Sequence, residues 1–336
     1  MQTNAVSDLA TGLRARRDNA ALKAALNRAA TEMTTGTVSD AVAATGGQLA
    51  DLLDIEHRIA LTQRFGPALA MASRRLGAAQ AALSGISATA GQLAPDLIAA
   101  TGRGDVTAQA SLAALARTGL EAAVAALNGR VAGQALFAGA ATDAAAVDAA
   151  SAILGDIGTI VSAQPDAATA AAAVSAYFAD PAGGFQSARY LGSQQPGPRM
   201  KVGENEEFPA LPAATDPAIL SVLEGFALAA SVDGGAFAGA PDQRSALLAA
   251  AGQKLLGAAD GLQSLRAGLG QSEGRAAEIE TGLAASRHAL DLARNEILAI
   301  DQFDAASRFE ALRGQLETGY LATATVSRLS LAGYLR

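Results

Sequence analysis

The chain lacks cysteine and tryptophan and has few aromatic residues. Aromatic residues make up 4% of the 336 residues, and the only histidines are His57 and His288. The absence of cysteine excludes disulfide frameworks, thiolate metal sites and cysteine nucleophiles. The scarcity of aromatic residues disfavours a sheet-dominated protein, because sheets draw on β-branched and aromatic side chains. We therefore expect a helical chain with little material for metal or acid–base chemistry.

Basic charge and long apolar runs are also scarce. The 25 lysine and arginine residues are outnumbered by 32 aspartate and glutamate residues, which gives a net charge of −7. This balance argues against a nucleic-acid partner, which requires a basic surface. The sequence shows no long apolar run that would predict a membrane span, and residues 1–10 lack the basic segment of a secretory signal. These features predict no membrane partner and no cleaved signal peptide.

Two heptad patterns occupy opposite ends of the chain. Apolar or small residues recur at alternating steps of three and four from Thr62 to Leu97, and again from Leu262 to Ile300. This spacing is typical of the seam of a coiled coil. Pro67 interrupts the first pattern, where we expect a kink or a helix start. Because the seams are distant in sequence, we expect them to pair with each other.

The middle of the chain has a different composition. Eight of the ten prolines fall between residues 128 and 241. Helical patterns there alternate with three short segments that could form strands. We expect these strands at Gln134–Ala138, Arg189–Leu191 and Arg199–Val202, with a turn at Gly203–Asn205.

These patterns predict a mainly α fold. Long antiparallel coiled-coil helices come from the N- and C-terminal parts, and a small α+β domain is inserted between them. We expect four segments: a terminal helix in residues 1–45, a discontinuous helical rod in 46–130 with 242–300, the insert in 131–241, and a C-terminal helix in 301–336. A break near Asp301–Asp304 and another in Thr34–Asp40 separate the terminal helices from the rod.

No residue pattern points to catalysis. The acidic cluster of Glu204, Glu206 and Glu207 lacks the spacing of a calcium loop, and we interpret it as a solvated turn. Gly102–Asp105 lacks the preceding strand of a phosphate-binding loop, so we expect a turn with Asp105 as a helix N-cap. We therefore predict no enzyme activity, no catalytic residue, no cofactor and no metal.

Four segments resemble the flagellin-like proteins of bacterial flagella. Ala299–Leu335 resembles their acidic break, following helix and Ser-Leu-Ser-Leu-x-x-Tyr-Leu-like tail. Arg266–Gly270 is similar to their Arg-Ala-x-x-Gly element, and Asn128–Gly139 to their Asn-x-x-x-x-Gly-x-Tyr-Leu-Phe-x-Gly hairpin. Leu26–Asp40 is similar to their Leu-x-x-Leu-Ser-Thr-Gly segment leading to Ser-Asp, although Met33-Thr34 replaces Leu-Ser.

The resemblance implies a structural role outside the cell. It implies an adaptor that joins the hook to the filament and leaves through the flagellar export apparatus without signal cleavage. The terminal helices would line a tube and order only on assembly, with the rod outside them and the insert on the surface. The implied partners are the other hook-associated junction protein, flagellin, further copies of the chain in a ring, and a cytosolic export chaperone at the C-terminal helix.

Apolar residues continue almost to both ends of the chain, which in a monomer would be exposed. Together with the resemblance, they give the assembly contacts that we predict: Val6, Leu9, Leu13, Leu312, Leu316, Leu321, Val326, Leu329, Leu331, Tyr334 and Leu335.

Other functions stay open at this point. A minor flagellin, which would form part of the filament itself, is the nearest alternative. A cytoplasmic signalling coiled coil would need heptads mirrored about a hairpin tip, whereas this middle is rich in proline and glycine. An enzyme with its active site in residues 128–241 is a further remote alternative.

Overall fold

The computed structural model describes residues 2–44 and 49–334, with side chains described for residues 10, 12–42 and 49–325. The chain divides into two compact units. We call residues 1–63 with 284–336 the terminal unit and residues 64–283 the central unit. Two long helices contribute to both units: α3 (Ala50–Arg103) and α8 (Pro241–Leu298).

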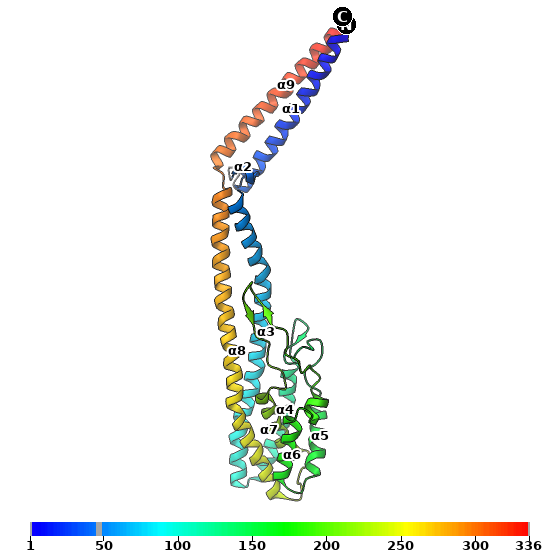
Figure 1. The fold of residues 1–336 in the computed structure, drawn as a ribbon, viewed down its shortest axis with the longest axis vertical. Helices are drawn as coiled ribbons and strands as arrows, with labels where there is room; N and C mark the ends of the chain where they lie inside the picture. The colour runs from blue at the N-terminus through cyan, green and yellow to red at the C-terminus, as the bar shows by residue number, and fades with distance from the viewer. Residues whose placement is uncertain (1, 45–48, 335–336) are drawn as a thin grey trace. The chain divides into compact units, whose positions relative to one another are not determined.

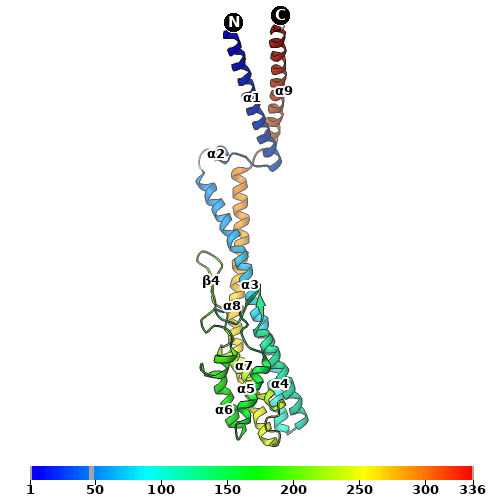
Figure 2. The ribbon, with the colours of Figure 1, turned by 90° about the vertical axis from the view of Figure 1, so that its right-hand side faces the viewer.

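The terminal unit is built on an antiparallel pair of helices. Helix α1 (Gln2–Thr35) lies beside α9 (Gln302–Tyr334), with the two chain termini at the same end of the pair (Figure 1). The short helix α2 (Ala41–Ala44) follows α1. The remainder of this unit comes from the first turns of α3 and the last turns of α8 (Figure 2).

The two predicted helix breaks are observed and contact each other. Helix α1 ends before Gly36, whose φ of +70° is a conformation that glycine adopts without strain. Helix α9 begins after Asp301, whose carboxylate accepts the N–H of Phe303 at 2.8 Å. The N–H of Val38 donates to the carbonyl of Leu298 at 2.8 Å, so backbone hydrogen bonds join the two breaks.

The central unit is a helical core that carries two small hairpins. Helix α4 packs along α7, and α5 and α6 pack against α7 and each other. The helices are α4 (Val106–Leu127), α5 (Ala150–Ser162), α6 (Ala167–Ala179) and α7 (Pro217–Asp233). One hairpin pairs β1 (Arg130–Val131) with β2 (Gln134–Ala135), and the other pairs β3 (Met200–Lys201) with β4 (Glu207–Phe208).

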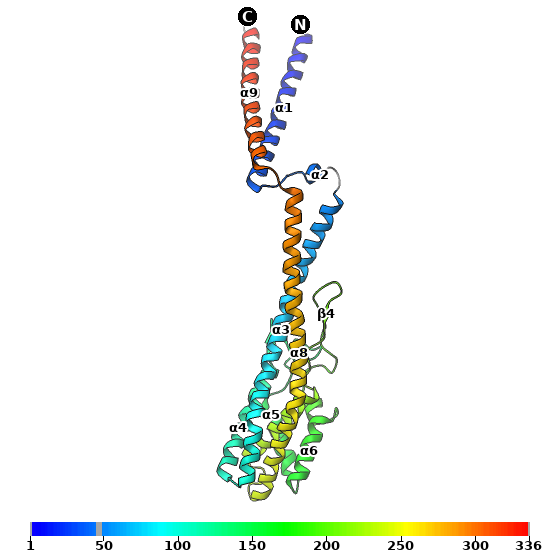
Figure 3. The same cartoon turned by 90° about the vertical axis from the view of Figure 1, so that its left-hand side faces the viewer.

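Within the central unit the two predicted seams pair in antiparallel fashion (Figure 3). A Cβ atom added to Gly252 of α8 would lie 2.9 Å from Cγ1 of Ile98 on α3, so the helices touch closely there. Near the other end of this pairing, Gly77 faces Glu273. Leucines of α3 and α8 share one core: Leu76, Leu83, Leu97, Leu255, Leu262 and Leu269. The prediction of a mainly α fold with a small α+β part is confirmed.

Helix α3 runs through both of its prolines, so of the two possibilities expected near Pro67 the helix start is wrong, and the kink stays a prediction. Each proline removes one helical hydrogen bond and leaves a carbonyl one turn earlier without its partner. Both Pro67 and Pro95, and the residues four positions before them, are exposed. Water can therefore satisfy the freed carbonyls.

The expected strands are shorter than predicted, and one is absent. Of Gln134–Ala138 only the first two residues are in a strand. Phe185–Arg189 forms a single π-helical turn, followed by an isolated bridge between Val147 and Tyr190. Hydrogen bonds from the N–H of Asp148 to the carbonyl of Arg189 and from the N–H of Leu191 to the carbonyl of Ala146 flank this bridge. The Arg189 side chain pairs with Asp148 and Asp156. The turn expected at Gly203–Asn205 is present between β3 and β4.

Helix α4 corrects the expectation about apolar runs. It is long and apolar enough to cross a membrane by length and composition alone. One face of α4 is buried against α7, with Leu120 and Leu127 fully enclosed. The exposed face carries the charged pair Arg117 and Glu121. Its apolar composition is thus that of a core helix of the central unit.

Candidate assembly surface

The helix pair of the terminal unit buries very little. Among the described side chains of α1 and α9, only Ala29 and Ala305 are buried, with exposed fractions of 2% and 5%. Burial of a leucine-sized side chain contributes about 1.5–3 kcal/mol, and two alanines supply far less. The pair therefore lacks the core that would hold two long helices together.

Polar contacts between α1 and α9 are also few. The Asn19 amide donates to the hydroxyl of Thr323 at 3.4 Å, and Arg308 lies 3.8 Å from Glu32. The Glu32 carboxylate also accepts the backbone N–H of Ser39 at 3.0 Å, so it links α1 to the break that follows it. Arg308 is exposed, so its ion pair with Glu32 contributes about 0–1 kcal/mol, and the hydrogen bond of Asn19 to Thr323 is long. These contacts orient the two helices but add little stability.

Large apolar side chains of the terminal unit face solvent instead. Leu13 on α1 is 56% exposed, and Leu321 on α9 is 70% exposed. Phe303, in the first turn of α9, is 78% exposed, and Tyr320 is 52% exposed. Exposed apolar residues in number mark surfaces that bind another protein. The terminal unit therefore presents an apolar surface that its own helices do not cover.

The structure places the predicted contact residues in two ways. Leu13 and Leu321 point to solvent, whereas Leu312 and Leu316 are half-buried. Leu312 lines a cavity of about 290 Å³ together with Ala25 and Ala29, so it faces α1. The remaining predicted side chains lie outside the described ones: Val6, Leu9, Val326, Leu329, Leu331, Tyr334 and Leu335. The assembly role of all these residues stays a prediction.

Sequence reasoning missed Phe303, the most exposed large apolar side chain described. It follows the acidic break directly, and Asp301 caps the helix turn that presents it. The sequence does give one indication that Phe303 is exposed. The residue lies between two aspartates in a helix-capping segment, and capping residues lie at the surface. Phe303 is not a seam position of the heptad pattern, because the pattern changes register at the acidic break.

The residues considered for chemistry are held in ordinary contacts. Glu206 pairs with Arg275 at 2.7 Å, and Glu207 lies 3.6 Å from Arg199. Asp105 caps α4 as predicted and accepts the N–H of Ala108 at 3.0 Å. No group of three or more acidic or histidine side chains able to hold a metal occurs in the part of the chain that the structure describes.

Comparisons with known proteins agree with the resemblance seen in the sequence. Residues 253–335 match the family described as the bacterial flagellin C-terminal helical region. The fold is similar to FlgL of Bacillus cereus, with a TM-score of 0.51 and 13% identity, covering 72% of this chain and 98% of that one. A Vibrio parahaemolyticus protein described as flagellar hook-associated also matches, with a TM-score of 0.41, 13% identity, and coverage of 71% and 95%. No curated protein matches the sequence.

The family match concerns the sequence of the C-terminal helices, and the FlgL match concerns the fold. The family match includes most of α8 and all of α9, and so contains Phe303, Leu312 and Leu321 of the apolar surface. The structural match concerns the arrangement of the helices. The chain thus has a fold similar to that of FlgL from Bacillus cereus, and its residues 253–335 are similar to the C-terminal helical region of bacterial flagellins.

Proposed function

We propose that this chain is a structural adaptor of the bacterial flagellum, the counterpart of hook-associated protein 3 at the hook–filament junction. The apolar surface of the terminal unit is the observation that carries the proposal. Helices α1 and α9 bury only Ala29 and Ala305 among their described side chains, while Leu13, Phe303 and Leu321 stand in solvent. Such helices gain their stability from neighbouring subunits.

In this proposal the terminal helices carry the assembly contacts. Leu13 and Leu321 pack against neighbouring chains, while Leu312 and Leu316 strengthen the α1–α9 pair once it is enclosed. Copies of the chain form a ring, with the other hook-associated junction protein on one side and flagellin on the other. The flagellin-like C-terminal region, residues 253–335, supports the contact with flagellin.

We assign a place in the proposed assembly to each of the four predicted segments. Residues 1–45 and 301–336 form the inner layer, residues 46–130 with 242–300 form the rod, and residues 131–241 face outward. Before export, a cytosolic chaperone covers the apolar C-terminal helix and so prevents premature association. The protein then leaves through the flagellar export apparatus and acts outside the cell, without catalysis, a cofactor or a metal.

Deletion of the gene in its host tests the adaptor role directly. We expect intact hooks without filaments by electron microscopy, together with unpolymerised flagellin in the medium. Complementation with the intact gene restores filaments, which controls for effects on neighbouring genes.

A minor flagellin is the alternative that the same experiment separates. Filaments that persist after deletion, shortened or altered, would support the minor flagellin and contradict the adaptor. Unchanged motility in a host without a second copy of the gene would contradict both. The copy number on isolated filaments gives a second criterion, since a flagellin occurs along the whole filament and an adaptor only at its base.

A further inference from the structure

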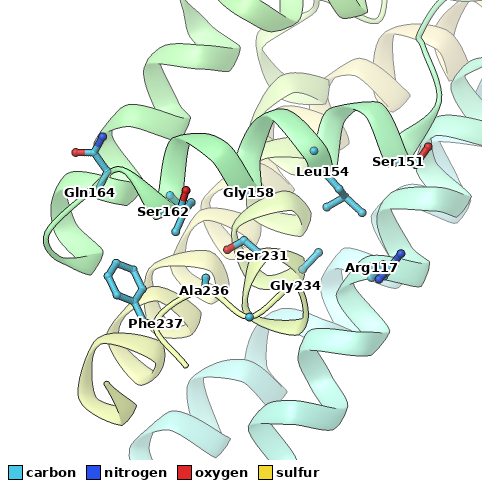
Figure 4. Close-up of a pocket in the computed structure, with 14 residues that line it drawn as sticks. Arg117, Ser151, Leu154, Gly158, Ser162, Gln164, Ser231, Gly234, Ala236 and Phe237 are labelled. Carbon is cyan, nitrogen blue, oxygen red and sulfur yellow. The ribbon is translucent and has the colours of Figure 1, made fainter. Parts of the chain in front are cut away.

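One pocket of the central unit lies between helices that the assembly role does not use. Its volume is about 550 Å³, and its walls come from α4, α5, the end of α7 and the loop after α7 (Figure 4). Small-molecule sites in proteins span about 300–1,000 Å³. The pocket therefore has room for a small ligand.

Glycines keep this pocket open. Gly155 and Gly158 lie one turn apart on α5 and line it, and a Cβ atom added to either would meet nothing within 4 Å. Gly235, on the loop after α7, has the same open space beside it. Glycine inside a helix costs about 1 kcal/mol relative to alanine. Two such residues side by side on one wall of a pocket preserve space that larger side chains would fill.

The pocket offers no unpaired formal charge. Arg117 is the one charged side chain among the 14 described residues that line it. Its guanidinium already lies 3.3 Å from Asp233 and 3.5 Å from Glu121. A strongly charged ligand would have to compete with one of these neighbours. The charge balance thus favours a neutral ligand.

The residues that line the pocket offer both hydrogen-bond donors and hydrogen-bond acceptors. Ser231 is 6% exposed, and its hydroxyl donates to the carbonyl of Leu228 at 2.7 Å, so its oxygen remains available to accept. Gln164 and Ser151 also line the pocket, and their side chains make no hydrogen bond within the described residues. The Gln164 amide supplies both donors and an acceptor. These groups suit a ligand that carries several hydroxyl groups.

An aromatic ring completes the wall. Phe237 is half-buried and lies on the same side of the pocket as Gln164 and Ser162 in Figure 4. Its φ of +51° is a strained conformation for a residue with a side chain. Such strain is found at functional sites, where it holds a group in a required position. The electron-rich face of an aromatic ring attracts the C–H edges of a saturated ring.

We propose that this pocket binds a neutral sugar of one or two rings. The hydroxyl groups bond to Gln164 and Ser231, and one apolar face of the sugar ring lies on Phe237. The glycine wall of α5 accommodates the bulk of the ring. Because the site uses α4, α5 and α7, it is independent of the proposed assembly surface in the terminal unit.

Ligand-observed NMR with the full chain tests the site. The probes are methyl glucoside, N-acetylglucosamine and its β-1,4-linked disaccharide, with glucuronate and glucosamine as charged counterparts. We expect saturation transfer to the neutral sugars with dissociation constants on the order of 1 mM, and binding of the charged ones weaker by about tenfold or more. Retention of the methyl glycoside indicates that a sugar attached to a longer chain also fits.

Three variants separate binding from folding. Gly158→Leu extends a side chain into the pocket from a Cβ position that has no atom within 4 Å, and it favours the helix, so binding is lost while the melting temperature is kept or raised. Gly268→Leu on α8 is the matched control, because its Cβ also meets open space but lies outside the pocket, and its binding stays unchanged. Phe237→Gly removes the ring at a φ that glycine adopts freely, and affinity falls by about tenfold or more.

The proposal has clear contrary outcomes. Absence of saturation transfer to every neutral probe at about 20 mM would overturn it, since an affinity that weak has no recognisable specificity. Equal binding by Gly158→Leu and Gly268→Leu would place the sugar elsewhere and overturn it as well. A change in the oligomeric state of Gly158→Leu alone, measured by sedimentation, would assign the pocket to a contact between copies.

Discussion

At the scale of single residues, Gly119 of α4 decides how closely α4 approaches α7. A Cβ atom added there would lie 2.8 Å from Cε1 and 3.1 Å from Cδ1 of Phe226, whose ring is fully buried. The ring has no room to move, so Gly119→Ala is expected to destabilise the fold by about 1–3 kcal/mol despite its better helix propensity. Gly85→Ala on α3 meets open space and is expected to stabilise by up to about 1 kcal/mol. Urea denaturation of both variants measures the difference, and two equal stabilisations would contradict the packing argument.

A second residue-scale prediction concerns Asp156. Two nitrogens of Arg189 donate to its carboxylate at 2.8 and 2.9 Å, and Tyr177 donates at 2.8 Å, which together hold the pKa of Asp156 below its usual value near 3.8. A folded-state pKa below the unfolded one means that the stabilisation is complete above about pH 4 and is lost as the pH falls through the folded value.

Asp156→Asn isolates this contribution. We expect a loss of roughly 1–3 kcal/mol at pH 7, because the uncharged amide has one acceptor oxygen where the carboxylate accepts from two nitrogens of Arg189 and from Tyr177. Between about pH 4 and pH 2 the parent protein should lose stability faster than the variant. Thermal melts across this range give the measurement. Parallel pH profiles would show that the aspartate is not held in its charged form.

At the scale of elements, the heptads of α3 and α8 and both helix breaks could be read from the sequence, because spacing and Gly36 or Asp301 fix them locally. The strand expected at Arg189–Leu191 is a single bridge at Tyr190, and its partner Val147 is distant in sequence, so no local pattern fixes its extent. Exposure of Phe303 and the pocket of α5 also depend on which faces the fold covers. A periodic sequence pattern does not reveal which residues are covered by elements that are distant in sequence.

The apolar faces of α1 and α9 give an element-scale prediction that rests on the proposed function. Leu13→Asp and Leu321→Asp change exposed side chains, so the stability of the isolated chain should stay within about 0.5 kcal/mol. In the host, each should abolish filament attachment, because a buried unpaired carboxylate is costly in an assembled interface. Motility and electron microscopy of complemented strains measure the effect.

Leu115→Asp provides the matched control for these two variants. Leu115 is 51% exposed on α4 of the central unit, so the change is of the same kind at a site outside the proposed surface. We expect Leu115→Asp to restore filaments as the intact gene does. Normal filaments with all three variants would remove Leu13 and Leu321 from the assembly surface while leaving the deletion test of the adaptor unaffected.

At the scale of the whole molecule, the two units differ in how much of themselves they bury. The central unit encloses large side chains on nearly every helix, among them Leu120, Phe178 and Phe226, whereas α1 and α9 bury two alanines among their described side chains. Amide hydrogens exchange through local opening, and the opening free energy follows the burial of the segment. Hydrogen exchange on the isolated chain should therefore be at least about 100-fold faster in α1 and α9 than in α4 and α7. The same helices should become protected when the chain is part of assembled flagella, because subunit contacts add the burial that the pair lacks. Equal protection of α1, α9, α4 and α7 in the isolated chain would mean that the α1–α9 pair is stable alone. That result would contradict the inference that neighbouring subunits stabilise the pair by covering its apolar surface.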